Sequence, residues 1–187
     1  QVAAASVGAF PFPAGSPDAA ILVTLEPDAY TVTATADRFT AGITLVEVYD
    51  VTGIGSRLVN LSARNYSDTG ANTLIAGMAV DGNSPRTLLV RAVGPTLAAL
   101  GVGDVLLDPR LVIKDAGRTI AQNNDWSTGG NAPLIVAAAE AVGAFALPAG
   151  SKDAAQILAL APGTYTIEVS GVNATTGNAL VEVYEVP

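Results

Sequence analysis

The sequence predicts an all-β protein, an antiparallel β-sandwich of jelly-roll-like type, from three observations. Gly (19) and Pro (11) are frequent, and charged residues make up only 14% of the 187 positions. Short segments rich in Val, Ile, Thr and Tyr alternate with turn-forming residues. A segment near the N-terminus also recurs at the C-terminus. These features are typical of many short strands joined by turns around one core.

The internal repeat organises the chain. Residues 7–51 align without a gap on residues 142–186, and 23 of the 45 aligned pairs are identical. Identical runs include Val-Gly-Ala-Phe, Pro-Ala-Gly-Ser and Leu-Val-Glu-Val-Tyr, which chance does not produce. We therefore expect a partial repeat at residues 1–51 and a complete β-sandwich unit at residues 52–187.

Each copy of the repeat predicts three strands. We expect them at residues 20–25, 29–35 and 43–51 in the first copy, and at 155–160, 164–170 and 178–186 in the second. A Pro beside a turn-forming residue separates the first two strands in both copies, which favours a tight reversal. The Tyr-Thr-Val and Tyr-Thr-Ile runs that follow alternate between two faces, one of which is available for a core.

The segment between the copies supplies the remaining strands of the complete unit. Hydrophobic runs bounded by Gly, Asn and Asp predict strands at residues 57–62, 72–80, 86–93, 109–115 and 118–123. Short helices are expected at residues 96–100 and 133–142, the second with Asn131 as its cap and Pro133 in its first turn. Eight strands after residue 52 suit a sandwich of two sheets.

Charge and missing residue types exclude several classes of function. A net charge of −8 repels nucleic acid and anionic lipid, so neither is an expected partner. No apolar run of about 18 residues is free of charges and breakers, so no membrane insertion is expected. Cys and His are absent, which removes disulfides, thiolate zinc sites, Cys nucleophiles and imidazole bases. We therefore expect no enzymatic activity.

Two runs of sequence resemble the bacterial pre-peptidase C-terminal type of β-sandwich. The first is residues 109–126, and the second is Ala-Pro-Gly-Thr-Tyr-Thr-Ile-Glu-Val-Ser-Gly at residues 161–171. The resemblance covers roughly residues 105–187, and the first copy shares only its final part. It implies a module of large secreted proteins, at an extracellular or cell-surface location, that accompanies enzymes or builds surface architecture.

A calcium site is one hypothesis for the loop after residue 122. Asp115, Asn123, Asn124 and Asp125 concentrate carboxylate and amide oxygens, which calcium prefers as ligands. Only two of the four are charged, and the pre-peptidase pattern has an acidic pair where this chain has Asn123-Asn124-Asp125. The alternative interpretation is that these side chains form turns with their own backbone.

Polysaccharide is a second candidate ligand, because Trp126 could stack on a sugar ring. The alternative is that this Trp closes one end of the sandwich. Glu47 and Glu182 hold equivalent positions in the two copies, and we interpret them as solvated side chains rather than a catalytic acid pair. Candidate glycosylation sequons lie at Asn60, Asn65 and Asn173.

The incomplete first copy has a physical consequence. Three strands of a sandwich on their own expose an apolar face and strand edges, which recruit another strand or chain. Three arrangements remain open: packing on the complete unit as a pseudo-symmetric partner, completion by another subunit through strand addition, or a cut in a longer tandem array.

We expect a structural protein that associates with itself, head to tail, into a filament, stalk or surface assembly. The alternative is a non-catalytic carbohydrate- or calcium-binding accessory module of a secreted enzyme. The expected assembly interface comprises Val7, Phe10, Phe12, Ile43, Leu45, Val46, Val48 and Val51.

Overall fold

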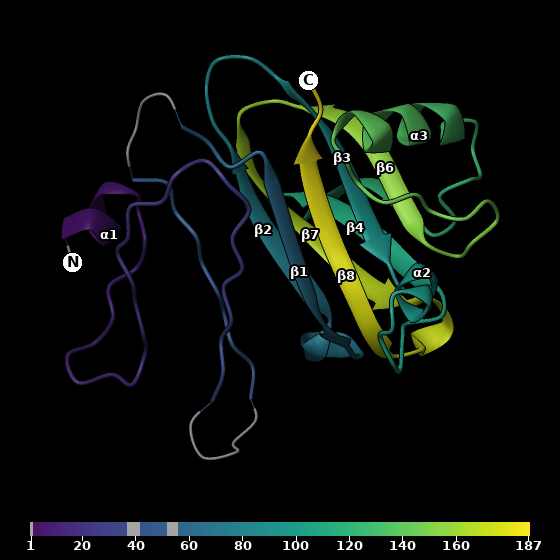
Figure 1. The fold of residues 1–187 in the computed structure, drawn as a ribbon. Helices are drawn as coiled ribbons and strands as arrows, with labels where there is room; N and C mark the ends of the chain where they lie inside the picture. The colour runs from purple at the N-terminus through teal and green to yellow at the C-terminus, as the bar shows by residue number, and fades with distance from the viewer. Residues whose placement is uncertain (1, 37–41, 52–55) are drawn as a thin grey trace. The chain divides into compact units, whose positions relative to one another are not determined.

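The computed structural model describes residues 2–36, 42–51 and 56–187 (Figure 1). The chain divides into two compact units. They are Gln1–Leu58, called unit 1, and Val59–Pro187, called unit 2. The predicted domain boundary between residues 51 and 52 adjoins residues outside the described ranges and stays a prediction. No described helix is long and apolar enough to cross a membrane.

Unit 2 is a sandwich of two four-stranded antiparallel sheets (Figure 1). The first sheet has the order β1-β8-β3-β6 and the second the order β2-β7-β4-β5. The predicted all-β sandwich is therefore confirmed. The strands are β1 (Asn60–Ser67), β2 (Leu74–Val80), β3 (Arg86–Val93), β4 (Pro109–Asp115), β5 (Arg118–Asn123), β6 (Ala154–Leu160), β7 (Gly163–Gly171) and β8 (Gly177–Glu185).

The predicted elements of unit 2 are confirmed with shifts of a few residues. The largest shift is at β1, expected at residues 57–62 and observed at Asn60–Ser67. The helices are α2 (Pro95–Ala99), which starts on its Pro, and α3 (Ala132–Ala141), with single turns η2 (Gly70–Asn72) and η3 (Val172–Ala174).

The three C-terminal strands are interleaved with the earlier ones. β8 lies between β1 and β3, β7 lies between β2 and β4, and β6 borders β3. Of the six strand ladders, five include β6, β7 or β8, and only the β4–β5 ladder does not. The second copy of the repeat therefore supplies paired strands to each of the two sheets.

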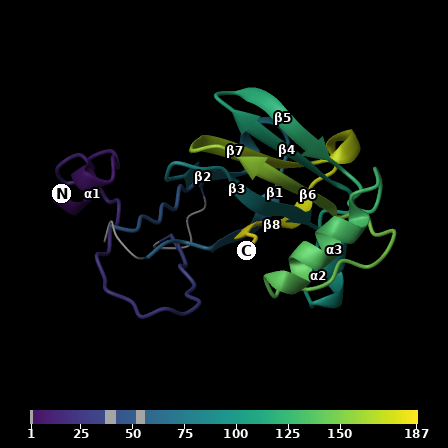
Figure 2. The same cartoon turned by 90° about the horizontal axis from the view of Figure 1, so that it is seen from above.

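Two apolar layers cover the two faces of the first sheet. The main core lies between the sheets and includes Val90 and Val181. On the opposite face α3 packs against β3 and β6 (Figure 2), around Leu89 and Ile135. Because successive strand residues face opposite sides, Leu89 and Arg91 of β3 point into the α3 layer.

Unit 1 contains the short helix α1 (Val2–Ser6) and no strand among its described residues. The prediction of strands at residues 20–25, 29–35 and 43–51 is therefore wrong for the chain on its own. Their counterparts β6, β7 and β8 gain backbone hydrogen bonds from β1 to β4. Residues 1–51 carry no copy of those partner strands, so the backbone groups have no ladder to join.

Candidate functional site

Several local features of the repeat recur in both copies, although only the second copy forms strands. α1 corresponds to the last part of α3, and a Gly with positive φ lies two residues after the end of each helix, 73° at Gly8 and 70° at Gly143. Two backbone hydrogen bonds recur at matching positions. They are Ala9 N to Ala4 O (3.0 Å) with Ala144 N to Ala139 O (2.9 Å), and Ser16 N to Pro13 O (3.1 Å) with Ser151 N to Pro148 O (3.0 Å).

Local side-chain contacts recur as well. Each copy has a Tyr hydroxyl bonded to a nearby carbonyl, a Tyr hydroxyl bonded to a Glu two residues earlier, and a Ser bonded to an Asp two residues later. In unit 1 these are Tyr30 to Glu26 O (2.9 Å), Tyr49 to Glu47 (3.0 Å) and Ser16 to Asp18. In unit 2 they are Tyr165 to Ala161 O (2.9 Å), Tyr184 to Glu182 (2.8 Å) and Ser151 to Asp153 (2.7 Å).

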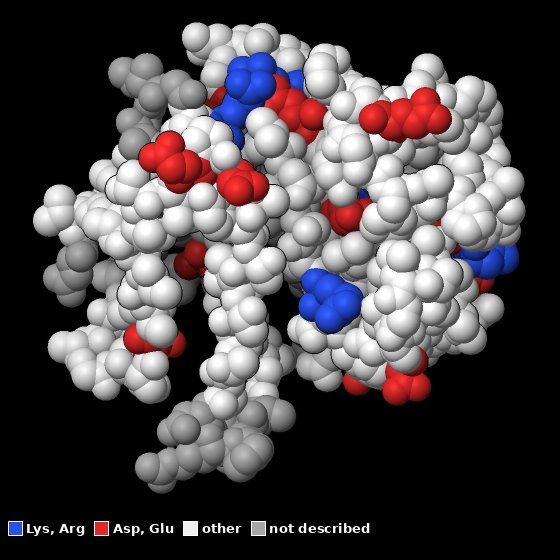
Figure 3. Space-filling model, in the orientation of Figure 1, with Lys and Arg blue, Asp and Glu red and all other residues white. Residues whose placement is uncertain are grey.

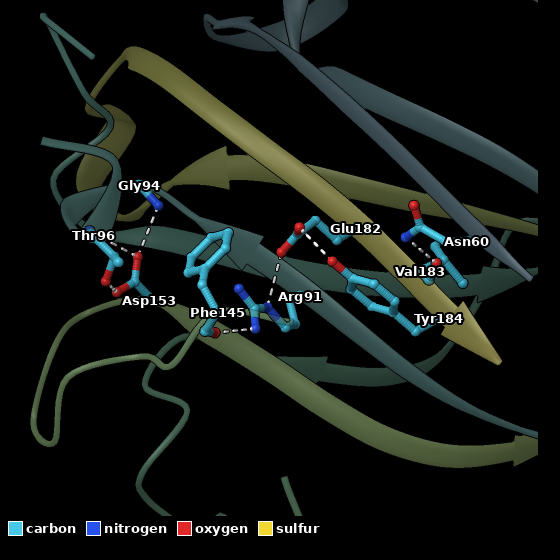
Figure 4. Close-up of polar contacts among 9 residues, drawn as sticks. All are labelled: Asn60, Arg91, Gly94, Thr96, Phe145, Asp153, Glu182, Val183 and Tyr184. Atoms are coloured by element: carbon cyan, nitrogen blue, oxygen red, sulfur yellow. Dashed lines mark hydrogen bonds and ion pairs between the residues drawn. The ribbon is translucent and has the colours of Figure 1, made fainter. Parts of the chain in front are cut away.

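Arg91 of β3 anchors the second copy from outside the repeat. Its side chain is fully buried, and its Nε lies 2.9 Å from Oε2 of Glu182 on β8 (Figure 4). Its Nη1 donates to the carbonyl oxygen of Phe145 at 2.6 Å. The guanidinium carbon lies 4.2 Å from the centroid of the Phe145 ring, a cation–π distance. One side chain of β3 therefore binds two parts of the repeat.

Asp153 forms a second buried junction with the same part of the fold. It is fully buried and precedes β6. Its Oδ1 accepts hydrogen bonds from the backbone N–H groups of Gly94 (2.8 Å) and Thr96 (3.3 Å), at the start of α2. Its Oδ2 accepts from the Thr96 hydroxyl (Figure 4). It also accepts from the Ser151 hydroxyl. These donors satisfy a carboxylate that has lost its water.

Tyr184 is half-buried and contacts the Arg91 junction, because its hydroxyl donates to Glu182. Burial raises the pKa of Tyr184 to about 12, with smaller contributions from the hydrogen bond to Glu182 and from its charge. The same kind of contact, Tyr49 with Glu47, raises the pKa of Tyr49 in unit 1, where the hydrogen bond is the main cause.

We expect an absorbance titration of the tyrosines to show one phenol ionising near pH 12, and Tyr184→Phe to remove that transition. Since the folded state holds this proton more tightly than the unfolded state, unit 2 loses stability as pH rises from about 10 to about 12. A Tyr184→Phe titration unchanged from the wild type would contradict this assignment.

Sequence reasoning missed both junctions. The interpretation of Glu182 as a solvated side chain is wrong, because Glu182 is only 4% exposed. The available signal was Arg91 itself, a single charge inside the apolar run Leu-Leu-Val-Arg-Ala-Val of β3. A lone charge in such a run needs a buried partner of opposite sign.

Unit 1 retains the repeat-side residues of both junctions. Phe10, Asp18 and Glu47 are identical to Phe145, Asp153 and Glu182. All three are exposed in unit 1. Their partners in unit 2 are Arg91, Gly94 and Thr96. These three residues belong to a part of the sandwich of which residues 1–51 contain no copy.

The predicted assembly residues lie on the surface of unit 1. Val46 and Val48 are each 48% exposed, whereas their counterparts Val181 and Val183 are 1% and 7% exposed. Charged side chains are sparse, and most of the described surface in Figure 3 is uncharged. Of the remaining predicted residues, Phe10, Phe12, Ile43, Leu45 and Val51 are exposed and Val7 is half-buried. Their role in assembly stays a prediction.

The four predicted calcium ligands are not gathered at one point. Asp115 pairs with Arg118 and Asn123 with Leu111, so Asp115 and Asn123 lie at opposite ends of the β4–β5 ladder, roughly 13 Å apart along the strand. In the described part of the chain, no group of three or more Asp, Glu, His or Cys side chains could hold a metal ion.

The loop residues of that set have other contacts. Asn123 donates to the Asp125 carbonyl at 3.2 Å and accepts from the Ala155 N–H at 3.1 Å. Asp125 lies 2.9 Å from Lys152, and the hydrogen bond and charge of Asp125 raise the pKa of Lys152. The contact of Asn123 with the Asp125 carbonyl fits the turn interpretation, and calcium binding at Asp115, Asn123, Asn124 and Asp125 stays a prediction.

Trp126 closes one side of the α3 layer. It is 5% exposed, and its Nε1 donates to the Pro148 carbonyl at 3.2 Å and to the Ser151 hydroxyl at 3.1 Å. Little of the ring is therefore accessible for stacking on a sugar. The sequon residues Asn60, Asn65 and Asn173 are exposed, with Asn60 donating to the Val183 carbonyl at 3.1 Å (Figure 4).

Comparison with solved structures gives a structural likeness. No protein-family model and no curated protein matches the chain. Among solved structures, it is similar to the pre-peptidase C-terminal domain of collagenase from Bacillus anthracis. The TM-score is 0.39 at 13% identity, over 67% of this chain and 89% of that chain. This is the type of β-sandwich that residues 105–187 resemble in sequence.

Proposed function

We propose that this chain is an extracellular structural protein that associates with β-sandwiches of its own kind. In this proposal unit 2 is a finished sandwich, and unit 1 joins it to the next one in a filament, stalk or other surface assembly. The observation that carries the proposal is the contrast between identical residues, buried in the second copy and exposed in the first.

The apolar surface of unit 1 favours association. Its exposed side chains include Ile21 at 90%, Ile43 at 84% and Leu22 at 73%. Burying one such side chain fully stabilises an interface by about 1.5–3 kcal/mol. A handful of them therefore matches the cost of association, which is about 4–15 kcal/mol.

Backbone pairing adds to this driving force. The described residues of unit 1 from 9 to 36 and from 42 to 51 form no strand, although their counterparts form three. Unpaired strand segments with apolar side chains recruit further strands. The buried carboxylates of unit 2, Asp153 and Glu182, serve structural contacts, which supports a non-catalytic role.

We expect the full chain to assemble in a concentration-dependent way, and a chain beginning at Val59 to remain monomeric. Sedimentation velocity at several concentrations measures the association, and negative-stain electron microscopy shows its form. The truncated chain keeps all eight strands and both apolar clusters of the sandwich, so it should fold. Its melting temperature should match that of unit 2 in the full chain.

Monodisperse monomers from both chains at all concentrations would contradict the proposal. A melting temperature that rises with added polysaccharide or calcium, as binding to the native state requires, would then favour the accessory-module alternative.

A further inference from the structure

We infer that unit 1 is a strand donor. Its acceptor is a half-sandwich of the same repeat type, which has the equivalents of β1 to β5 and lacks those of β6, β7 and β8, so that unit 1 fits the open β6-β7-β8 place. This acceptor carries an arginine at the place of Arg91, which binds Glu47. The inference rests on the proposed function and identifies the partner of unit 1.

The topology of unit 2 defines what such an acceptor lacks. Without β6, β7 and β8, β1 has no neighbour in its sheet and β2 is separated from β4. Five ladders are then open, and their register is set by β1 to β4. Residues 19–25, 28–36 and 42–50 of unit 1 align with the three missing strands without a gap.

The identical residues of the two copies include those that contact the acceptor. Phe10, Asp18 and Glu47 match the residues through which the second copy contacts Arg91, Gly94 and Thr96. Glu182 and Asp153 are charged because buried partners require it. Glu47 and Asp18 are exposed, so nothing in the described part of unit 1 by itself requires a Glu and an Asp at these positions.

Positions that face solvent differ instead. Glu168 and Lys152 form partly exposed ion pairs with Lys114 and Asp125, and unit 1 has Thr33 and Pro17 at those positions. Unit 1 therefore keeps the residues that contact Arg91 and the start of α2 in the second copy, and loses these two ion pairs.

Stoichiometry indicates which acceptor unit 1 fits. Residues 1–187 include one set of β1 to β5 and two donors, and the C-terminal donor occupies that set. Exchange between identical chains leaves the number of completed sandwiches unchanged. A net gain therefore needs a partner whose β6-β7-β8 place is open, with the same arginine and helix start as unit 2.

The fit is testable in the full chain by weakening its resident donor. In the Glu182→Arg variant, Arg91 faces a second positive charge. Glu47 of unit 1 still has the charge that pairs with Arg91. Arg64 of β1 pairs with Leu180 of β8, whose counterpart in unit 1 is Leu45. Opposite residues of an antiparallel pair have Cα atoms about 4.5–5.5 Å apart, which suits a disulfide. The chain has no Cys of its own.

We expect Leu45→Cys with Arg64→Cys to form a disulfide in the Glu182→Arg background, at least tenfold more than with Glu182 retained. Adding Glu47→Arg should abolish it. Leu180→Cys with Arg64→Cys in the native background is the positive control for the geometry. Intramolecular and intermolecular bonds, separated on a non-reducing gel, both support the fit.

A folded Glu182→Arg chain without the disulfide would overturn the inference. Complete loss of sheet structure would do so too, because unit 1 would then have failed to replace the resident donor. A second design reverses the charges, with Arg91→Glu and Glu47→Arg, and its control keeps Glu47. Assembly of the wild-type chain without any 45–64 disulfide in these variants would leave the proposed function standing and remove only this inference.

Discussion

Replacement of Glu182 by Ala is expected to lower the free energy of unfolding of unit 2 by about 3–5 kcal/mol. The reason is the position of Arg91, which is fully buried with its Nε 2.9 Å from the Glu182 carboxylate. Removing the carboxylate leaves the guanidinium desolvated and without its counter-charge. The aromatic ring of Phe145 beside it compensates only in part.

Denaturant unfolding of the full chain measures this loss, and the repeat provides a matched control. Glu47 has the same neighbours in sequence and the same hydrogen bond from a Tyr, yet it is exposed. Glu47→Ala should leave the unfolding midpoint of unit 2 unchanged. Equal effects of the two substitutions would contradict the different environments that the structure gives the two copies.

Replacement of Asp153 by Ala is expected to have a similar effect, about 3–5 kcal/mol. Its carboxylate accepts two backbone N–H groups at the start of α2 and two hydroxyl groups, in a fully buried place. Ala leaves these donors without an acceptor. Asn keeps one acceptor oxygen, so Asp153→Asn should lose less.

Asp18 is the matched control for Asp153. It accepts a local hydrogen bond from Ser16, as Asp153 does from Ser151, and it is exposed. Asp18→Ala should not change the unfolding of unit 2. A small loss for Asp153→Ala, below about 1 kcal/mol, would show that the junction with α2 contributes no more than an ordinary neutral hydrogen bond.

The fold of unit 2 could be predicted because its patterns are local. Turn residues and short apolar runs mark every strand, and β3 and β5 lie at the predicted residues. The contacts of Arg91 with Glu182 and Phe145 could not be predicted from local patterns, because β3 is buried on both faces. Such a strand shows a nearly continuous apolar run, which hides which residues face which layer.

The strands predicted for unit 1 show the limit of the same reasoning. Residues 42–51 carry the alternating pattern of β8, including the identical Leu-Val-Glu-Val-Tyr run. A strand, however, exists only when another strand pairs with it, and the partners of β8 lie far away in sequence, at β1 and β3. The local contacts of the repeat need no partner strand and form in both copies.

Hydrogen–deuterium exchange by mass spectrometry tests the central claim, that one repeat is built into a sandwich and its copy awaits an acceptor. In dilute monomeric protein, amides of Ala154–Leu160, Gly163–Gly171 and Gly177–Glu185 should exchange slowly, and those of residues 19–25, 28–36 and 42–50 rapidly. Binding to an acceptor whose β6-β7-β8 place is open should then slow the second set. Equal protection of both copies in the monomer would contradict the account.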